Sequence, residues 1–258
     1  MQLIYKKSGI TMNQFIQLIK EENKDKKIAY AGRLDPMARG LVPILFDEEC
    51  NNMNKFTEMK KIYQVRVIVG ISTDTDDTLG IIQDMKLSHD INYNLSNIID
   101  RMNISNEVSN EISNEISNEI SNEISNKISI NQSFHYYSTK QINKRRRNDN
   151  TDSKHTVKLY KSNVIKTGTM CIQTWIKDII STINTIDKTK EFRQNDIIKQ
   201  WSNISNMDCL EEINNKIQYI DLELTVSSGF FIRQYIRDLM EHSNIPLLCY
   251  DIHRISIY

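Results

Sequence analysis

Segments with strand periodicity and segments with helix periodicity interleave along this 258-residue chain without a regular spacing. Apolar and polar residues alternate over Tyr63–Gly70, Lys154–Ile165 and Ile217–Val226, which is typical of strands with one buried face. Helix periodicity is found over Met12–Lys20 and Phe231–His242. Because there is no repeated strand–helix–strand unit and no glycine-rich nucleotide fingerprint, we expect an α+β fold with a mostly antiparallel central sheet flanked by helices.

The composition is that of a folded chain, with 39% hydrophobic and 26% charged residues. We expect a single domain over residues 1–258. No run approaches the roughly 18 apolar residues of a membrane helix, and the N-terminus becomes charged at Lys6, too early for a signal peptide. The four cysteines lie far apart without a CxxC pair, which argues against a disulfide framework or a zinc site. We therefore expect an intracellular protein of a reducing compartment, cytoplasm or nucleus, with no metal and no membrane association.

A Ser-Asn-Glu-Ile repeat marks residues 103–130 as a low-complexity insertion. Its apolar residues recur every fourth position, so on a helix of 3.6 residues per turn they would wind around the axis and face no single partner. Asn and Ser are poor helix formers, so we expect at best a frayed helix. A coiled-coil partner site is the alternative, although the period is neither 3.5 nor 3.67 residues.

Charge is unevenly distributed although the whole chain is neutral. The repeat carries five glutamates against Lys127, whereas Lys140–Lys166 contains nine lysines and arginines against two aspartates. Within that basic run we expect residues 141–154 to form a polar exposed loop. A cationic segment of this kind attracts phosphate backbones, and a solvated loop or a nuclear localisation signal is the alternative.

The segment Ala29–Pro43 concentrates two of the seven glycines and two of the three prolines of the chain. Asp35 precedes Pro36, which biases its backbone to an extended conformation. We expect a stiff loop that presents the Asp35 carboxylate and is anchored to the core by Leu34 and Leu41. On these residues alone, the Asp-Pro pair could equally do no more than initiate a turn.

Three further segments with motif residues follow this loop in order along the chain. They are Lys61-Ile62-Tyr63, then Gly70–Gly80 with Thr73, Asp74, Thr75 and Asp77, and finally Ser227-Ser228-Gly229-Phe230-Phe231-Ile232-Arg233. Together with Gly32, Leu34, Asp35, Pro36, Ala38 and Gly40 they resemble the motifs of the TruB family of tRNA pseudouridine synthases. Lys6–Thr11 resembles the family's N-terminal motif with Lys7 in place of proline, and Tyr137-Ser138 with Lys140 resembles a further motif imperfectly.

The resemblance implies a pseudouridine synthase fold and isomerisation of uridine to pseudouridine in RNA, most simply at the T-loop uridine of tRNA, position 55. No cofactor is implied, since the reaction has no redox change and needs no external energy source. By resemblance, Asp35 is the carboxylate nucleophile, Arg233 pairs with it, and Tyr63 stacks on the target base. Phe231 and Ile252 would pack against the same base.

The RNA partner implied by the resemblance would be held by basic residues and by Tyr30, which stands where the family has a histidine and can stack on a nucleotide. The residues expected to contact RNA are Arg33, Lys61, Lys140, Lys144, Arg145, Arg146 and Arg147.

The chain stops four residues after Arg254, so we expect no C-terminal RNA-binding PUA domain and a monomer that needs no protein partner. Two alternatives stay open. One is a guide-dependent, dyskerin-like enzyme acting on ribosomal RNA, and the other is a catalytically inactive RNA-binding or RNA-folding module.

Overall fold

The computed structural model describes residues 1–87, 92–103, 128–132, 155–188, 192–204 and 215–258. The predicted loop 141–154, Lys140 and most of the predicted insertion lie outside these residues. Residues 128–130 of that insertion belong instead to a strand, β7 (Ile128–Gln132), which pairs with β8 (His155–Cys171). The expectation of a frayed helix is therefore wrong for these three residues.

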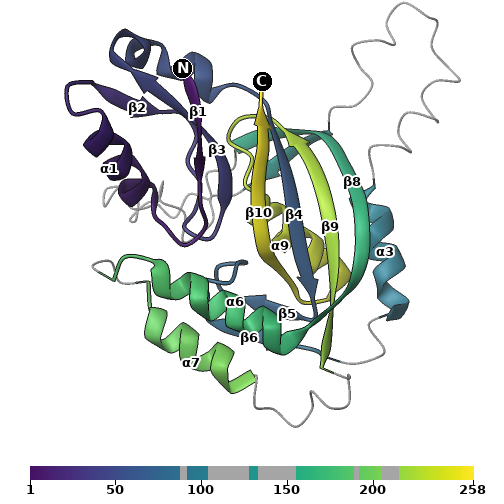
Figure 1. The fold of residues 1–258 in the computed structure, drawn as a ribbon. Coiled ribbons are helices and arrows are strands. Elements are labelled where there is room, and N and C mark those ends of the chain that lie inside the picture. The colour runs from purple at the N-terminus through teal and green to yellow at the C-terminus, as the bar shows by residue number, and fades with distance from the viewer. Residues whose placement is uncertain (88–91, 104–127, 133–154, 189–191, 205–214) are drawn as a thin grey trace, which may run out of the picture.

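The described residues form one large mixed sheet in the order β1-β3-β10-β4-β9-β8-β7, with β2 added to β3. All neighbours are antiparallel except β10 and β3, which are parallel, so the predicted α+β class with a mostly antiparallel sheet is confirmed (Figure 1). The remaining bounds are β1 (Gln2–Lys6), β2 (Ile28–Tyr30), β3 (Arg39–Phe46), β4 (Lys61–Val69), β9 (Lys216–Val226) and β10 (Leu247–Ile257).

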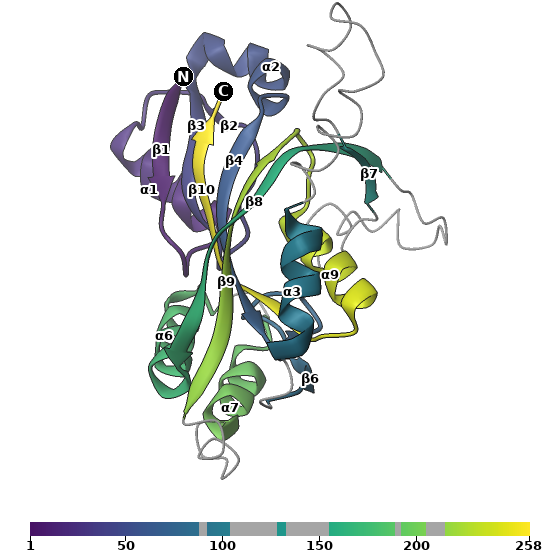
Figure 2. The same cartoon turned by 90° about the vertical axis from the view of Figure 1, so that its right-hand side faces the viewer.

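Two hydrophobic cores cover opposite faces of this sheet, because successive side chains of a strand point to opposite sides. On one face α1 (Met12–Glu22), α3 (Asn92–Met102) and α9 (Ile232–Ser243) pack over residues such as Val65 and Leu222. On the other face α6 (Ile172–Thr185) and α7 (Gln194–Ile204) pack over Ile68. Figure 2 shows α3 and α9 on one side of the strands and α6 and α7 toward the other.

The segments predicted from periodicity are present. Helix α1 begins after Thr11, which forms a capping box with Gln14. Strands β4, β8 and β9 and helix α9 contain the predicted segments except at single terminal residues: Gly70 and Phe231 lie just outside β4 and α9, and Lys154 lies outside the described residues. Helix α6 was missed, although its buried residues Ile172, Trp175, Ile176, Ile179 and Ile183 follow helical spacing.

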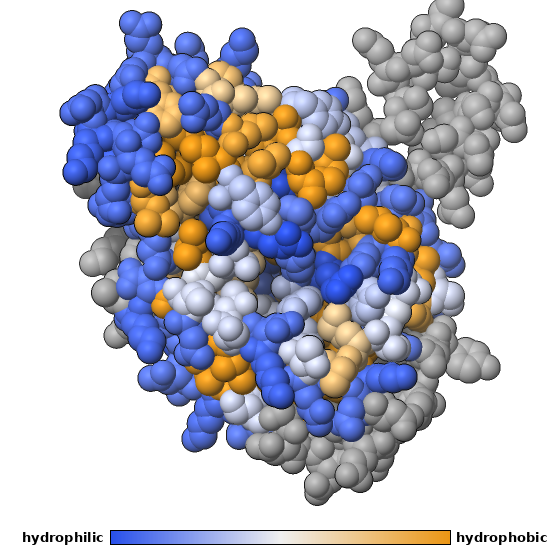
Figure 3. All heavy atoms as spheres, in the orientation of Figure 1, coloured by the Kyte–Doolittle hydropathy of each residue, from blue (hydrophilic) through white to orange (hydrophobic). Residues whose placement is uncertain are grey.

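Shorter elements complete the fold. A two-stranded sheet joins β5 (Ile71–Thr73) to β6 (Ile82–Met85), and a 3₁₀-helix (Asp47–Asn52) leads into α2 (Met53–Thr57). Hydrophobic side chains gather over the upper part of the face shown in Figure 3. Leu3 and Tyr5 of β1 are among the exposed large hydrophobic residues. No helix among the described residues is long and apolar enough to cross a membrane.

Candidate active site

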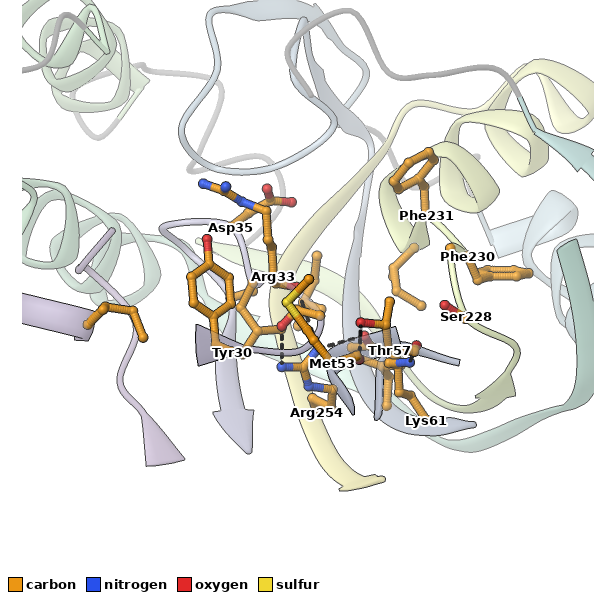
Figure 4. Close-up of a pocket in the computed structure, with 18 of the residues that line it drawn as sticks. Tyr30, Arg33, Asp35, Met53, Thr57, Lys61, Ser228, Phe230, Phe231 and Arg254 are labelled. Carbon is orange, nitrogen blue, oxygen red and sulfur yellow. Dashed lines mark hydrogen bonds between the residues drawn. The ribbon is translucent and has the colours of Figure 1, made fainter. Parts of the chain in front are cut away.

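A pocket of about 630 Å³ opens on the face of the sheet that carries α1 and α9. Figure 4 shows Tyr30, Arg33 and Asp35 on one side of it and Phe230 and Phe231 across from them. The walls are largely apolar, with a few polar groups that include Asp35, which is the usual character of a small-molecule or nucleotide pocket. The pocket is lined by residues from α1, β2, the Gly32–Ala38 loop, α2, β4, the Ser228–Arg233 segment and β10.

Asp35 is presented by a tight turn between β2 and β3. The Ala38 amide donates to the Asp35 carbonyl oxygen (3.1 Å) and the Gly9 amide donates to the Pro36 carbonyl oxygen (2.9 Å). Leu34 anchors this turn in the core as expected, but Leu41 is only half-buried. Leu41 instead holds the chain after the turn through its backbone, because its carbonyl oxygen accepts a hydrogen bond from Arg254 Nε (2.6 Å).

The carbonyl oxygens of this turn converge on the buried ammonium of Lys6. Lys6 Nζ donates to the carbonyl oxygens of Ala38 (2.7 Å) and Asp35 (3.1 Å). Burial lowers the pKa of Lys6 to about 8, with Asp35 opposing the shift and Arg254 adding to it. The sequence motif contained Lys6, but its role as the cation beneath the turn follows only from the fold.

Asp35 forms an ion pair with Arg233, with Oδ2 and Nη2 2.9 Å apart, which is the pairing expected from the motifs. The Arg233 side chain is 9% exposed, whereas the Asp35 side chain is 37% exposed, so the carboxylate faces the pocket and the guanidinium lies beneath it. Arg233 Nη1 also donates to the Thr75 carbonyl oxygen (2.9 Å) and lies 3.5 Å from Asp77 Oδ2. Burial would lower the pKa of Arg233, but Asp35 and Asp77 outweigh it and raise that pKa above its ordinary value.

Asp77 is the second carboxylate that contacts Arg233, and residues of its own loop hold it in place. Its Oδ1 accepts hydrogen bonds from Thr75 Oγ1 (2.8 Å) and from the Leu79 amide (2.9 Å). Burial raises the pKa of Asp77, Arg233 lowers it, and the charge on Asp35 raises it further. Arg237, one helical turn beyond Arg233 on α9, forms an ion pair with Asp76 of the same loop at 2.8 Å. Two arginines on one helix face therefore fix the 74–77 loop against α9.

Tyr63 of β4 is 6% exposed and lines the pocket. Its hydroxyl lies 3.5 Å from Arg254 Nη1, the donor, and Arg254 Nη2 donates to the Gly32 carbonyl oxygen (3.1 Å). Gly40 of β3 lies directly against the Arg254 backbone, since a Cβ at Gly40 would come within 2.2 Å of the Arg254 carbonyl oxygen. Arg254 therefore links the first strands to Tyr63, a role that the motifs did not indicate.

The structure brings the other expected site residues that it describes to the same pocket, which Tyr30, Arg33, Lys61, Phe231 and Ile252 all line. The Arg33 guanidinium lies over the Tyr30 ring, 6.0 Å from its centroid. Lys61 is buried, its ammonium donates to the carbonyl oxygens of Thr57 and Met59, and burial together with Arg254 lowers its pKa to about 8. Contact of Lys61 with RNA stays a prediction. Lys140, Lys144, Arg145, Arg146 and Arg147 lie outside the described residues.

Within the described ranges, no group of three or more His, Cys, Asp or Glu side chains could hold a metal ion. The carboxylates of Asp35, Asp76 and Asp77 form ion pairs with Arg233 or Arg237.

Comparison with known proteins gives the family. The model of the TruB family pseudouridylate synthase N-terminal domain matches residues 20–182, more than half of the chain. This chain belongs to the TruB family. The motifs that placed Asp35 and Tyr63 in it therefore identified the family correctly.

Among curated relatives, tRNA pseudouridine synthase B of Staphylococcus aureus is 32% identical over 99 residues, which cover 38% of this chain and 32% of that protein. The Buchnera aphidicola enzyme of the same name is 40% identical over 80 residues, 31% of this chain and 26% of that protein. These matches therefore span about a third or less of the relatives' length.

A chain of an H/ACA RNP bound to a substrate RNA that contains 2′-deoxyuridine superposes with a TM-score of 0.50 at 12% identity. The superposition covers 98% of this chain and 45% of that chain. At this identity the similarity concerns the fold, and it agrees with the predicted pseudouridine synthase fold.

Proposed function

We propose that this protein isomerises uridine to pseudouridine in RNA with Asp35 as nucleophile, and that its substrate is the T-loop uridine at position 55 of tRNA. The observation that carries the proposal is the Asp35–Arg233 ion pair at the wall of a pocket that Tyr63 also lines. Membership in the TruB family and the names of the curated relatives support the reaction and the class of RNA.

The reaction needs little beyond a positioned carboxylate. The bond between N1 of uracil and C1′ of ribose breaks, the base turns, and a bond forms between C5 and C1′. C5 loses a proton and N1 gains one, so atoms and electrons balance without any co-reactant. The Asp35 carboxylate, half-open to the pocket, can attack the ribose or the base, or assist proton loss from the ribose. All three routes require the fixed orientation that Arg233 supplies.

A uridine inside a folded RNA loop must be turned out of its stack before it can reach Asp35, at a cost of about a few kcal/mol. Stacking on an aromatic side chain returns about 1–3 kcal/mol per base, so the aromatic rings that line the pocket are suited to hold the turned-out base. Tyr63 and Phe231 are the candidates for this contact. The Tyr30–Arg33 pair is suited to hold a neighbouring nucleotide of the loop.

The decisive experiment incubates the full chain with an unmodified tRNA transcript and maps pseudouridine at nucleotide resolution. We expect modification at position 55, and none in a transcript in which that uridine is replaced by cytidine. Asp35→Asn should abolish turnover while RNA affinity stays nearly unchanged, whereas Asp25→Asn, at an exposed turn, is the matched control and should keep full activity.

Other outcomes discriminate the alternatives. Activity that appears only after a guide RNA is supplied would support the dyskerin-like enzyme acting on ribosomal RNA. Binding of tRNA with no pseudouridine formed, under conditions where Asp35→Asn behaves as the wild type, would support an RNA-folding module. We also propose that the active species is a monomer, which sedimentation of the active fraction would test.

A further inference from the structure

Gln132, the last residue of β7, is completely buried and binds the backbone of Phe231. Gln132 Nε2 donates to the Phe231 carbonyl oxygen (3.1 Å), and the Phe231 amide donates to Gln132 Oε1 (2.8 Å). A side-chain amide offers the same donor and acceptor as a peptide group. The two hydrogen bonds therefore tie Phe231 to the end of β7 as a neighbouring strand would.

His155, the partner of Gln132 in the β7–β8 register, contacts the same turn. His155 Nε2 donates to the Gly229 carbonyl oxygen (2.9 Å), and its ring meets the Phe231 ring edge-on with centroids 5.1 Å apart. Gly229 has φ +78°, a conformation that favours glycine. The side chains of the final residue pair of the β7–β8 ladder thus hold the backbone of the Gly229–Phe231 turn by three hydrogen bonds.

This turn determines where α9 begins. Phe231 is the N-cap of α9, and its carbonyl oxygen also accepts a hydrogen bond from the Tyr235 amide (3.1 Å). The same carbonyl oxygen therefore accepts the first hydrogen bond of the helix and the hydrogen bond from Gln132. Arg233 follows two residues later and reaches Asp35 and the Thr75 carbonyl oxygen, both at 2.9 Å. Displacement of Phe231 would therefore move one aromatic wall of the pocket and the cation beneath Asp35 together.

We propose that Gln132 is a positioning residue for the reaction in this pocket. By holding the backbone of Phe231 at the start of α9, Gln132 sets the position of the Phe231 ring and of the Arg233–Asp35 pair. This inference rests on the proposed function for its kinetic test. In the part of the chain that the structure describes, no hydrogen bond or ion pair joins Gln132 directly to Asp35 or Arg233, so its influence is expected in kcat more than in RNA affinity.

Replacement of the amide by an acid separates positioning from simple packing. In Gln132→Glu, an ionised carboxylate accepts from the Phe231 amide but repels the Phe231 carbonyl oxygen. A protonated carboxyl restores both bonds. Burial and the facing carbonyl favour the protonated form, so the pKa of this acid should lie above that of an exposed glutamate. Of the titratable groups that the structure describes, His155 on β8 contacts the same turn through its Nε2 and its ring, and the wild type shares it.

The experiment compares Gln132→Glu, Gln132→Leu and the control Asn131→Asp with the wild type in kcat and KM from pH 6 to 8. Asn131 is exposed on the same strand and accepts from Thr156. We expect kcat of Gln132→Leu to fall roughly tenfold to a hundredfold at every pH, as misplacement of reacting groups does. The kcat of Gln132→Glu relative to the wild type should rise as the pH falls, while Asn131→Asp should follow the wild type throughout.

Equal pH profiles for Gln132→Glu and Gln132→Leu, or losses confined to KM, would overturn the inference. A second measurement does not depend on activity, namely hydrogen exchange of the peptide that contains Phe231 and Tyr235. Faster exchange there in Gln132→Leu, with exchange in β4 unchanged, supports the inference, and unchanged exchange overturns it. If the wild type modifies no RNA, the proposed function fails and the exchange result alone decides the role of Gln132.

Discussion

Gly40→Ala should be among the most damaging single-methyl substitutions in this fold. The added Cβ would lie 2.2 Å from the carbonyl oxygen and 2.7 Å from the amide nitrogen of Arg254, and both are backbone atoms that cannot turn aside. Gly40 also has φ +124°, a conformation that L residues rarely adopt.

The expected cost follows from these two terms. Backbone strain at such a φ costs about 1–3 kcal/mol. The clash can be relieved only if β3 moves away from β10, which pair in parallel through His253 with Arg39 and Arg254 with Gly40. If one net hydrogen bond is lost at each of these two residue pairs, at about 1 kcal/mol each, the free energy of unfolding should fall by about 3–5 kcal/mol in total. Activity should fall too, because Arg254 holds the Gly32 carbonyl oxygen and contacts Tyr63.

Urea unfolding followed by the fluorescence of the buried Trp175 and Trp201 measures this change. Gly229→Ala is the matched control, because Gly229 also has a positive φ (+78°) but a Cβ there would meet its nearest atom at an ordinary 3.8 Å. We expect the control to lose only about 1–2 kcal/mol from the strained φ. If the two variants were destabilised equally, the close approach of β3 and β10 at Gly40 would not matter, and the reasoning would be refuted.

Two further predictions concern buried charges. Arg233→Met should lower the free energy of unfolding by about 3–5 kcal/mol, because it leaves the buried Asp77 without its cation, and adding Asp77→Asn should recover part of the loss in urea unfolding. A double variant no more stable than the single one would contradict this. Burial lowers the pKa of Lys6 from the ordinary 10.5 to about 8 in the folded protein. Between these two pH values the unfolded chain therefore binds more protons than the folded protein, and the free energy of unfolding should rise with pH. Relative to Lys6→Met, the wild type should gain up to about 3 kcal/mol by pH 10.5. If the difference in free energy of unfolding between the wild type and Lys6→Met stayed constant from pH 7 to 10.5, the pKa of Lys6 would not be lowered by burial.

The motifs in the sequence predicted which residues meet in the pocket better than which residues support them. Asp35, Tyr63 and Arg233 were each assigned to the site from motif residues, and the structure brings all three to one pocket. Lys6 lay within a motif and Arg254 outside the motifs, and nothing in the sequence assigned either to the backbone of the Asp35 turn. Gln132 belongs to none of the sequence motifs. Its partner Phe231 lies 99 residues away in the sequence, and the two meet only because the end of β7 lies beside the start of α9 in the fold.

What the sequence determined by itself is local. The alternation in β4 and β9, the cap at Thr11 and the turn at Asp35 all depend on residues within a few positions of one another, and periodicity and propensity report on such neighbours. The tertiary structure decided what lies beside what. It places β10, the last strand of the chain, between β3 and β4, so that Arg254 meets Gly32 and Tyr63. Strand order and register depend on how two cores fill opposite faces of one sheet, and no single segment contains that information.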